Sequence, residues 1–234
     1  MKKRSKLWTS VFLLSSVRHQ TEEEHVFMPG KAPGPAGGPY EEEFMRATEI
    51  LVDEHRVIEQ MLSVMDEMAD RALQRGTLDS QGAAQVIDFI RTFADKCHHA
   101  KEEDVLFVRM EAVGFPHDNG PIAVMLHDHD SGRAFVRAMA DVVDDAARGD
   151  TDALRTFANN ARSYTEMLRA HIQKEDRILY PMADQSFDDS DQAELMAAFQ
   201  KADNQAGAGI HERYLELART LAGQYGISEG DRPR

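Results

Sequence analysis

The chain has 234 residues, with 27 Lys and Arg against 41 Asp and Glu, which leaves a formal net charge of −14. This length is typical of one domain with a tail. The acidic excess argues against a nucleic-acid partner, because a phosphate backbone is bound by clustered Lys and Arg. No apolar run is long enough to span a membrane. A single cysteine, Cys97, excludes an intrachain disulfide and favours a reducing, cytoplasmic location.

Residues 1–40 differ in texture from the rest of the chain. Basic residues near the start precede a short apolar stretch, 7–17, which is similar to a weak signal peptide. Polar residues interrupt that stretch and no small-residue cleavage site follows it, so a cytoplasmic location is favoured over export. Residues 29–39 are rich in Pro and Gly, which is typical of a linker. We therefore expect a disordered extension over 1–40 and a folded helical domain over 41–226.

Beyond residue 41, apolar residues recur every three or four positions, which is typical of helices that pack in a bundle. Capping and breaking residues predict four long helices, over about 42–75, from 79 or 80 to before 114, from about 121 to before 149, and from 150 or 151 to near 181. A fifth is predicted over about 191–222, with a break near Gly207 and Gly209. The pattern predicts an all-α protein: an antiparallel up-down four-helix bundle with an additional C-terminal helix.

Polar side chains interrupt the apolar stripes at positions that face the predicted core. They are His55, His98, Glu102, His129, His171 and Glu175. Burying carboxylates and imidazoles without partners is costly, so these groups require a cation among them. Their offsets from the helix ends, at about 1.5 Å per residue, place all of them in one layer of the bundle.

An internal repeat supports this grouping. Residues 98–107 and 171–180 both read His-x-x-x-Glu-acid-x-apolar-Leu-aromatic. A further histidine precedes each unit at a similar distance, since His55 lies 43 residues before His98 and His129 lies 42 residues before His171. The repeat predicts a pseudo-twofold site with four histidines and two glutamates.

Nitrogen and carboxylate ligands of this kind suit first-row metals, iron above all, whereas a single zinc ion would need only four. Two metal ions that share Glu102 and Glu175, with two histidines each and an oxo or hydroxo bridge, would use the whole set. A rival pair, His99 and Glu103, has the same spacing but lies one step round the helix. We prefer His98 and Glu102 because they match the repeat. His127, two residues from His129, should face away.

At these residues the sequence resembles the hemerythrin-like (HHE cation-binding) domain family, over about residues 45–185. The motifs are His55 within 53–58, His98 with Glu102, His129 within 125–133, and His171 with Glu175. The resemblance implies a non-haem di-iron centre that binds or reduces O₂, peroxide or NO. Members include oxygen carriers, oxygen, redox and iron sensors, and proteins linked to the repair of iron centres under nitrosative stress.

One departure from the family changes the emphasis. Oxygen-carrying members place a second histidine one turn from the first on the third helix, where this chain has Met125 and Arg133. We therefore expect a di-iron protein that binds or senses O₂, peroxide or NO in a stress response, rather than a reversible carrier. The alternatives are an oxidoreductase or iron donor in the repair of iron–sulfur centres under oxidative or nitrosative stress, and a structural or signalling bundle with a stabilising metal. The sequence leaves open whether the protein is an enzyme.

Overall fold

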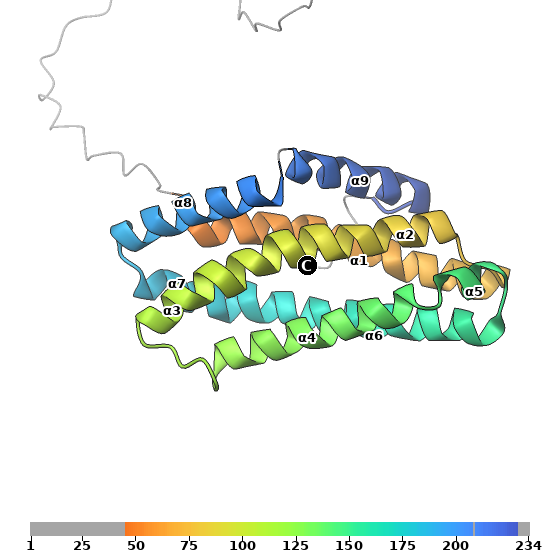
Figure 1. The fold of residues 1–234 in the computed structure, drawn as a ribbon, viewed down its shortest axis with the longest axis horizontal. Helices are drawn as coiled ribbons and strands as arrows, with labels where there is room; N and C mark the ends of the chain where they lie inside the picture. Colours follow the sequence, from red (N-terminus) through yellow and green to blue (C-terminus); the bar gives the residue numbers. More distant parts are fainter. Residues whose placement is uncertain (1–44, 208, 229–234) are drawn as a thin grey trace, which may run out of the picture. The chain divides into compact units, whose positions relative to one another are not determined.

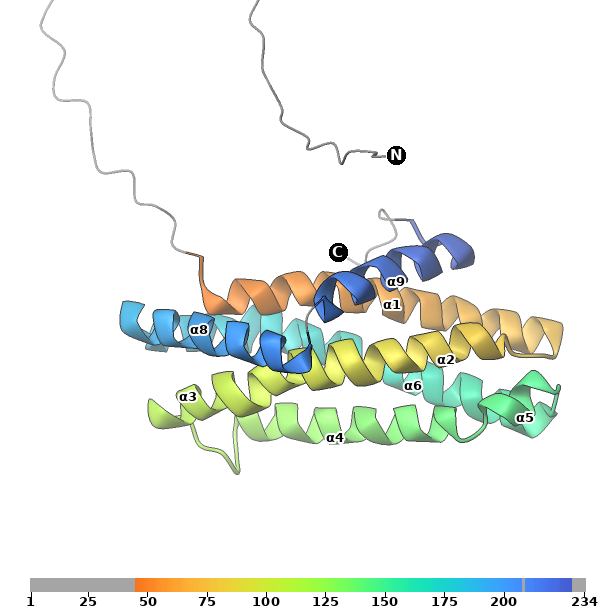
Figure 2. The same cartoon turned by 45° about the horizontal axis from the view of Figure 1, so that its top comes forward.

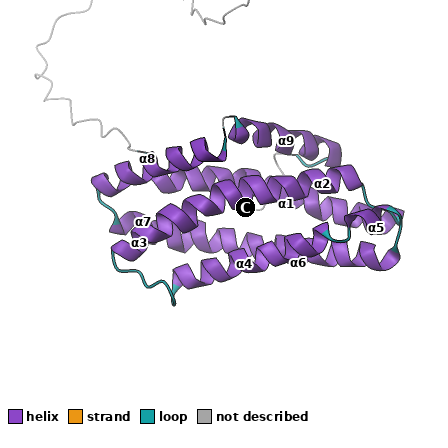
Figure 3. Ribbon diagram, viewed as in Figure 1, coloured by secondary structure: helices purple, strands orange, loops and turns teal. Residues whose placement is uncertain are grey.

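The structure, a computed structural model, describes residues 45–207 and 209–228. Within these ranges the chain is almost entirely helical and contains no strand (Figure 3). The all-α expectation is therefore confirmed for the described residues, and none of their helices is long and apolar enough to cross a membrane. The extension predicted over 1–40 and the predicted start of the first helix near 42 lie outside these residues.

Four long helical rods lie side by side, and connections at alternate ends join them (Figure 1). The first is α1 (Ala47–Arg75). The second combines α2 (Ser80–Phe89), the π-helical segments η1 (Ile90–His99) and η2 (Glu102–Leu106), and α3 (Phe107–Ala112). The third is α4 (Pro121–Ala140) with α5 (Val143–Ala147). The fourth is α6 (Thr151–Lys174), the π-helical η3 (Glu175–Leu179) and α7 (Tyr180–Ser186).

The rods begin and end where local chemistry allows. Asp79 and Asp150 cap α2 and α6, and their side chains accept hydrogen bonds from backbone N–H groups of the first turn. Gly76 closes α1 with a φ of 69°, a backbone conformation that favours glycine. The fourth rod differs from the prediction, since it continues through Pro181 to Ser186. Pro181 lies in the first turn of α7, directly after a π-helical turn, where a proline is tolerated.

A polar layer divides the apolar core into two clusters. On α1, His55 lies between Leu51 of one cluster and Ile58 of the other. The same holds on α4, where His129 lies between Met125 and Val136. Apolar side chains on both sides of this layer exclude water from it, so the polar groups there must satisfy one another or bind a ligand.

Two further helices, α8 (Asp189–Ala206) and α9 (Ile210–Tyr225), lie over α1 and the second rod (Figure 1 and Figure 2). They correspond to the predicted fifth helix and its predicted break. Gly207 and Gly209 have φ values of 128° and 75°, which explains why glycines occur at this turn. This cover buries part of the outer side of the second rod.

Lys101 is buried as a consequence, with none of its surface exposed. Its ammonium group pairs with Glu54 on α1 and lies 2.8 Å from a carboxylate oxygen of Asp203 on α8. One buried cation therefore ties the second rod to α1 and to the covering helices.

Replacing this cation tests its contribution to stability. We expect Lys101→Met to lower the free energy of unfolding by about 3–5 kcal/mol, because it leaves the buried Glu54 charge without its partner. Lys201→Met, at an exposed position on α8 that forms no ion pair with any described residue, should change it by less than about 0.5 kcal/mol. Urea unfolding of both variants measures the difference, and equal effects would contradict a structural role for Lys101.

Candidate metal centre

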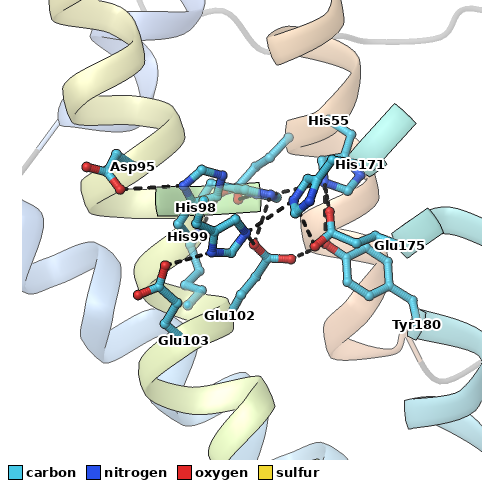
Figure 4. Close-up of polar contacts among 12 residues, drawn as sticks. His55, Asp95, His98, His99, Glu102, Glu103, His171, Glu175 and Tyr180 are labelled. Atoms are coloured by element: carbon cyan, nitrogen blue, oxygen red, sulfur yellow. Dashed lines mark hydrogen bonds and ion pairs between the residues drawn. The ribbon is translucent and has the colours of Figure 1, made fainter. Parts of the chain in front are cut away.

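The structure brings all six predicted ligand residues into the polar layer, each at most 1% exposed. Their donor atoms fall into two groups, and within each group these atoms lie within 4.8 Å of one another. The first group is His55, His98, Glu102 and Glu175. The second is His99, Glu102, His129 and His171. Figure 4 shows the rings of His55, His98, His99 and His171 beside the carboxylates of Glu102 and Glu175.

The histidines meet in pairs through their Nε2 atoms. The Nε2 atoms of His55 and His98 are 3.0 Å apart, and those of His129 and His171 are 3.1 Å apart. Glu175 lies between the two pairs, because its oxygens are 3.3 Å from His55 Nε2 and 3.1 Å from His171 Nε2. Two ligand clusters are thus joined through a shared carboxylate.

Glu102 joins the two halves in the same way. Its Oε2 atom lies 3.6 Å from His98 Nε2 and 3.5 Å from His129 Nε2. The two glutamates therefore occupy equivalent places, each between a histidine of one pair and a histidine of the other. This is the pseudo-twofold arrangement that the repeat predicts.

The outer nitrogen of each paired histidine faces an acid. The acid that precedes the first histidine of each half contacts the histidine of the following rod. Glu54 Oε2 lies 3.0 Å from His98 Nδ1, and Asp128 Oδ2 lies 3.4 Å from His171 Nδ1. An Nδ1–H group that donates outward leaves the Nε2 lone pair directed inward, which is the orientation that a metal ligand requires.

The other two histidines find their acid one residue after each glutamate. Glu103 Oε1 lies 2.6 Å from His129 Nδ1, and Asp176 Oδ1 lies 2.7 Å from His55 Nδ1. Glu103, which forms part of the rival pair, therefore lies outside both donor groups and contacts the outer nitrogen of His129. The second acid of each repeat unit thus orients a histidine on another rod.

Every one of these acids also meets a cation. The pairs are Glu54 with Lys101, Asp128 with Lys174, Asp176 with Arg56, and Glu103 with Arg133. The two lysines occupy equivalent positions of the repeat, immediately before each glutamate. A cation beside each acid favours its ionised form and limits its freedom to rotate.

His99 joins the cluster although we expected it one step round the helix. It is 6% exposed, and its ring stacks on His129 with 3.8 Å between ring centroids. Its Nδ1 atom lies 3.5 Å from Asp95 Oδ1. The wide turn of η1 rotates less per residue than an α-helix, which brings positions 98 and 99 toward the same side. The structure therefore gathers five imidazoles where we expected four.

Tyr180 is a neighbour of the cluster that we did not predict. Its hydroxyl group donates a hydrogen bond to Glu102 Oε1 at 2.6 Å and lies 3.3 Å from His55 Nε2. Burial and the charge of Glu102 raise the pKa of the phenol well above its usual value, so it stays protonated. Its signal in the sequence was the aromatic residue that ends each repeat unit.

Other candidates lie away from the donor groups. His127 is exposed on α4, as predicted from its spacing. Tyr164 is buried on α6 and forms no hydrogen bond with a residue of either donor group. His211 lies on α9 with its ring 5.3 Å from that of Phe93, and its Nδ1 atom lies 3.8 Å from Glu54 Oε1.

The two glutamates have opposite electrostatic environments. Burial and the neighbouring Glu175 raise the pKa of Glu102 well above its usual range. Burial alone would also raise the pKa of Glu175, but His171 and His55 outweigh it and lower that pKa well below its usual range. Oε2 of Glu102 and both oxygens of Glu175 accept no hydrogen bond from any described residue. These buried oxygens are therefore available to a cation.

Comparison with known proteins agrees with this geometry. The model of the hemerythrin HHE cation binding domain matches residues 46–183. Uncharacterized proteins of Mycobacterium tuberculosis and Mycobacterium bovis are 27% identical over 161 residues, which cover 65% of this chain and 61% of theirs. The chain thus spans about three fifths of the length of these curated relatives. No solved structure matches significantly. The family match spans more than half of the chain and includes every residue of both donor groups, so the chain belongs to the hemerythrin HHE cation-binding family.

Proposed function

We propose that the two donor groups hold two iron ions within an up-down four-helix bundle, and that this centre binds or senses O₂, peroxide or NO. Glu102 and Glu175 would be shared between the ions. The remaining ligands would be His55 and His98 on one side, and His99, His129 and His171 on the other. The observation that carries the proposal is the convergence of five imidazoles and two carboxylates in one water-excluded layer.

The spacing of the imidazoles fits this proposal. Bonds between first-row metals and imidazole nitrogens are about 2.1 Å long, so two ligands at right angles lie about 3.0 Å apart. The Nε2–Nε2 separations of 3.0 Å and 3.1 Å agree with that value. A hydrogen bond between the two Nε2 atoms would require one imidazole to carry its proton on Nε2. The contacts of His55 and His98 Nδ1 with acids instead favour the tautomer that carries the proton on Nδ1.

The bare carboxylate oxygens support the same conclusion. A buried carboxylate is costly unless it is both paired and hydrogen-bonded, and Glu175 contacts His55 and His171 while neither of its oxygens accepts a hydrogen bond from a described residue. A divalent or trivalent cation at the donor groups would offset this cost and the repulsion between the two glutamates. The protein's own nearby cations, such as Lys101, are instead committed to the outer acids.

The donor set favours iron over a zinc pair. Five imidazole nitrogens and four carboxylate oxygens are more donors than two four-coordinate zinc ions would need. Mixed imidazole and carboxylate ligands of this type suit iron. Bound iron would supply redox chemistry and affinity for small oxygen and nitrogen ligands. The chain itself orients the histidines, excludes bulk water with its two apolar clusters, and holds a phenolic proton beside Glu102.

Iron content tests the ligand assignment. We expect the purified chain to bind two iron ions, and His129→Ala to reduce this to one or fewer, because the change removes an inward Nε2 donor. His99→Ala should also lower the iron content. His127→Ala, at an exposed position on the same helix, should leave it unchanged. If His127→Ala and His129→Ala lose equal amounts of iron per chain, the assignment of the metal-binding face of α4 is wrong.

Absorption spectra test the function. The oxidised iron protein should absorb in the near ultraviolet and change on addition of azide, and the reduced protein should change on exposure to O₂ or NO. The same chain loaded with zinc should stay colourless and serves as the matched control. If none of these small ligands changes the absorption spectrum of the iron protein, the result favours a purely structural role for the metal.

Tyr180 favours the disproportionation of hydrogen peroxide to water and O₂ as a second candidate function, because its phenolic proton lies beside the buried Glu102. We expect Tyr180→Phe to slow peroxide consumption by about a hundredfold or more, the usual contribution of a positioned proton donor. Iron content should stay constant, since the phenol is not among the proposed ligands. Tyr214→Phe, on α9 beside Asp88, is the matched control. Unchanged turnover in Tyr180→Phe would contradict the role of this phenol.

A further inference from the structure

A cavity of about 290 Å³ opens between η1, α4 and α6. Apolar side chains line much of it; they are Ile90, Val136, Met167 and Leu168. His99 and His129 also line this cavity, so it adjoins the second donor group. At roughly 30 Å³ for each water-sized group, the cavity accommodates about ten non-hydrogen atoms. It is therefore larger than a diatomic ligand or peroxide requires.

A small residue on α4 keeps this space open. A Cβ atom at Gly132 would lie 3.2 Å from Met167 Cε and 3.3 Å from Tyr164 Cε2, so even alanine would crowd the wall. Glycine within a helix lowers helix stability, and here it preserves the volume. Tyr164 also lines the cavity, is only 2% exposed, and makes no hydrogen bond with any described residue. Its hydroxyl group is therefore available to a bound molecule.

Cations outnumber acids in the lining of this cavity, with Arg91, Lys96, Arg133 and Arg137 against Asp95 and Asp128, although the whole chain has a net charge of −14. Arg91, Lys96 and Arg137 line it, are exposed, and form no ion pair with any residue that the structure describes. Arg133 differs, because Asp95 and Glu103 already hold its guanidinium group. Three uncommitted cations around an apolar cavity are complementary to a molecule with an apolar body and an anionic end.

We propose that this cavity binds an amphipathic organic anion, namely a medium-chain carboxylate. The hydrocarbon part lies against Val136, Met167 and Leu168, and the carboxylate lies among Arg91, Lys96 and Arg137. This site adjoins the second donor group through His99 and His129, but it holds its anion among exposed cations rather than at a metal.

Calorimetric titration of the purified full chain with octanoate tests the proposal. We expect about one octanoate per chain, with octan-1-ol and acetate each binding at least about tenfold more weakly, because one lacks the charge and the other lacks the apolar body. Equal affinity for octanoate and octan-1-ol would overturn the role of the cations. Equal affinity for octanoate and acetate would overturn the role of the apolar wall.

Variants locate the site. The double change Arg91→Glu with Arg137→Glu should weaken octanoate binding by about tenfold and leave octan-1-ol binding unchanged. The double change Arg213→Glu with Arg219→Glu alters the net charge equally at exposed positions on α9, and it should leave octanoate binding unchanged. If both double variants weaken binding equally, the interaction is with the overall charge and the proposal fails.

Met167→Trp fills the cavity and should abolish octanoate binding, whereas Met167→Leu keeps the volume and should preserve it. Octanoate bound to iron instead would change the absorption spectrum and persist in the Arg91→Glu with Arg137→Glu variant. That result would overturn the proposed position of the anion while leaving the proposed iron centre intact.

Discussion

The structure depends on one constraint: two carboxylates and five imidazoles share a layer of the core from which water is excluded. Glu175 has no hydrogen bond to either oxygen among the described residues, and Glu102 lies close enough to repel it. Apolar clusters pack on both sides of the layer, and each of its donor residues is at most 6% exposed. Without a cation, this arrangement lowers the free energy of unfolding. Metal binding and stability are therefore linked in this chain.

The residues around the layer fix the orientation of its histidine rings. Each paired histidine contacts an acid through its outer nitrogen, and each acid contacts a cation, so two successive contacts hold each ring in place. The contact from His98 to Glu54 to Lys101 crosses from the second rod to α1 and returns, and Asp203 extends it to α8. Because these contacts link different rods, they fix the relative heights of the helices as well as the ring orientations.

Much of the site was readable from the sequence because helical periodicity and the repeat act on the same residues. His55, His98, His129 and His171 lie on the apolar seams, and a seam position in a bundle specifies the direction of a side chain. His99 was not readable in this way, because its inward direction comes from a π-helical turn. The burial of Lys101 depends on α8, a contact between residues distant in sequence.

The two halves of the repeat agree in their proposed ligands and differ in two neighbouring residues. Position 99 is histidine where the second unit has Ile172, so one half gains a fifth imidazole. Position 180 is tyrosine where the first unit has Phe107, so a phenolic proton reaches Glu102 near His55. The cavity lined by Arg91, Lys96 and Arg137 adjoins the His99 half. A chain built from two similar units thus has a phenolic hydroxyl group beside His55 of one half and a cavity beside His99 and His129 of the other.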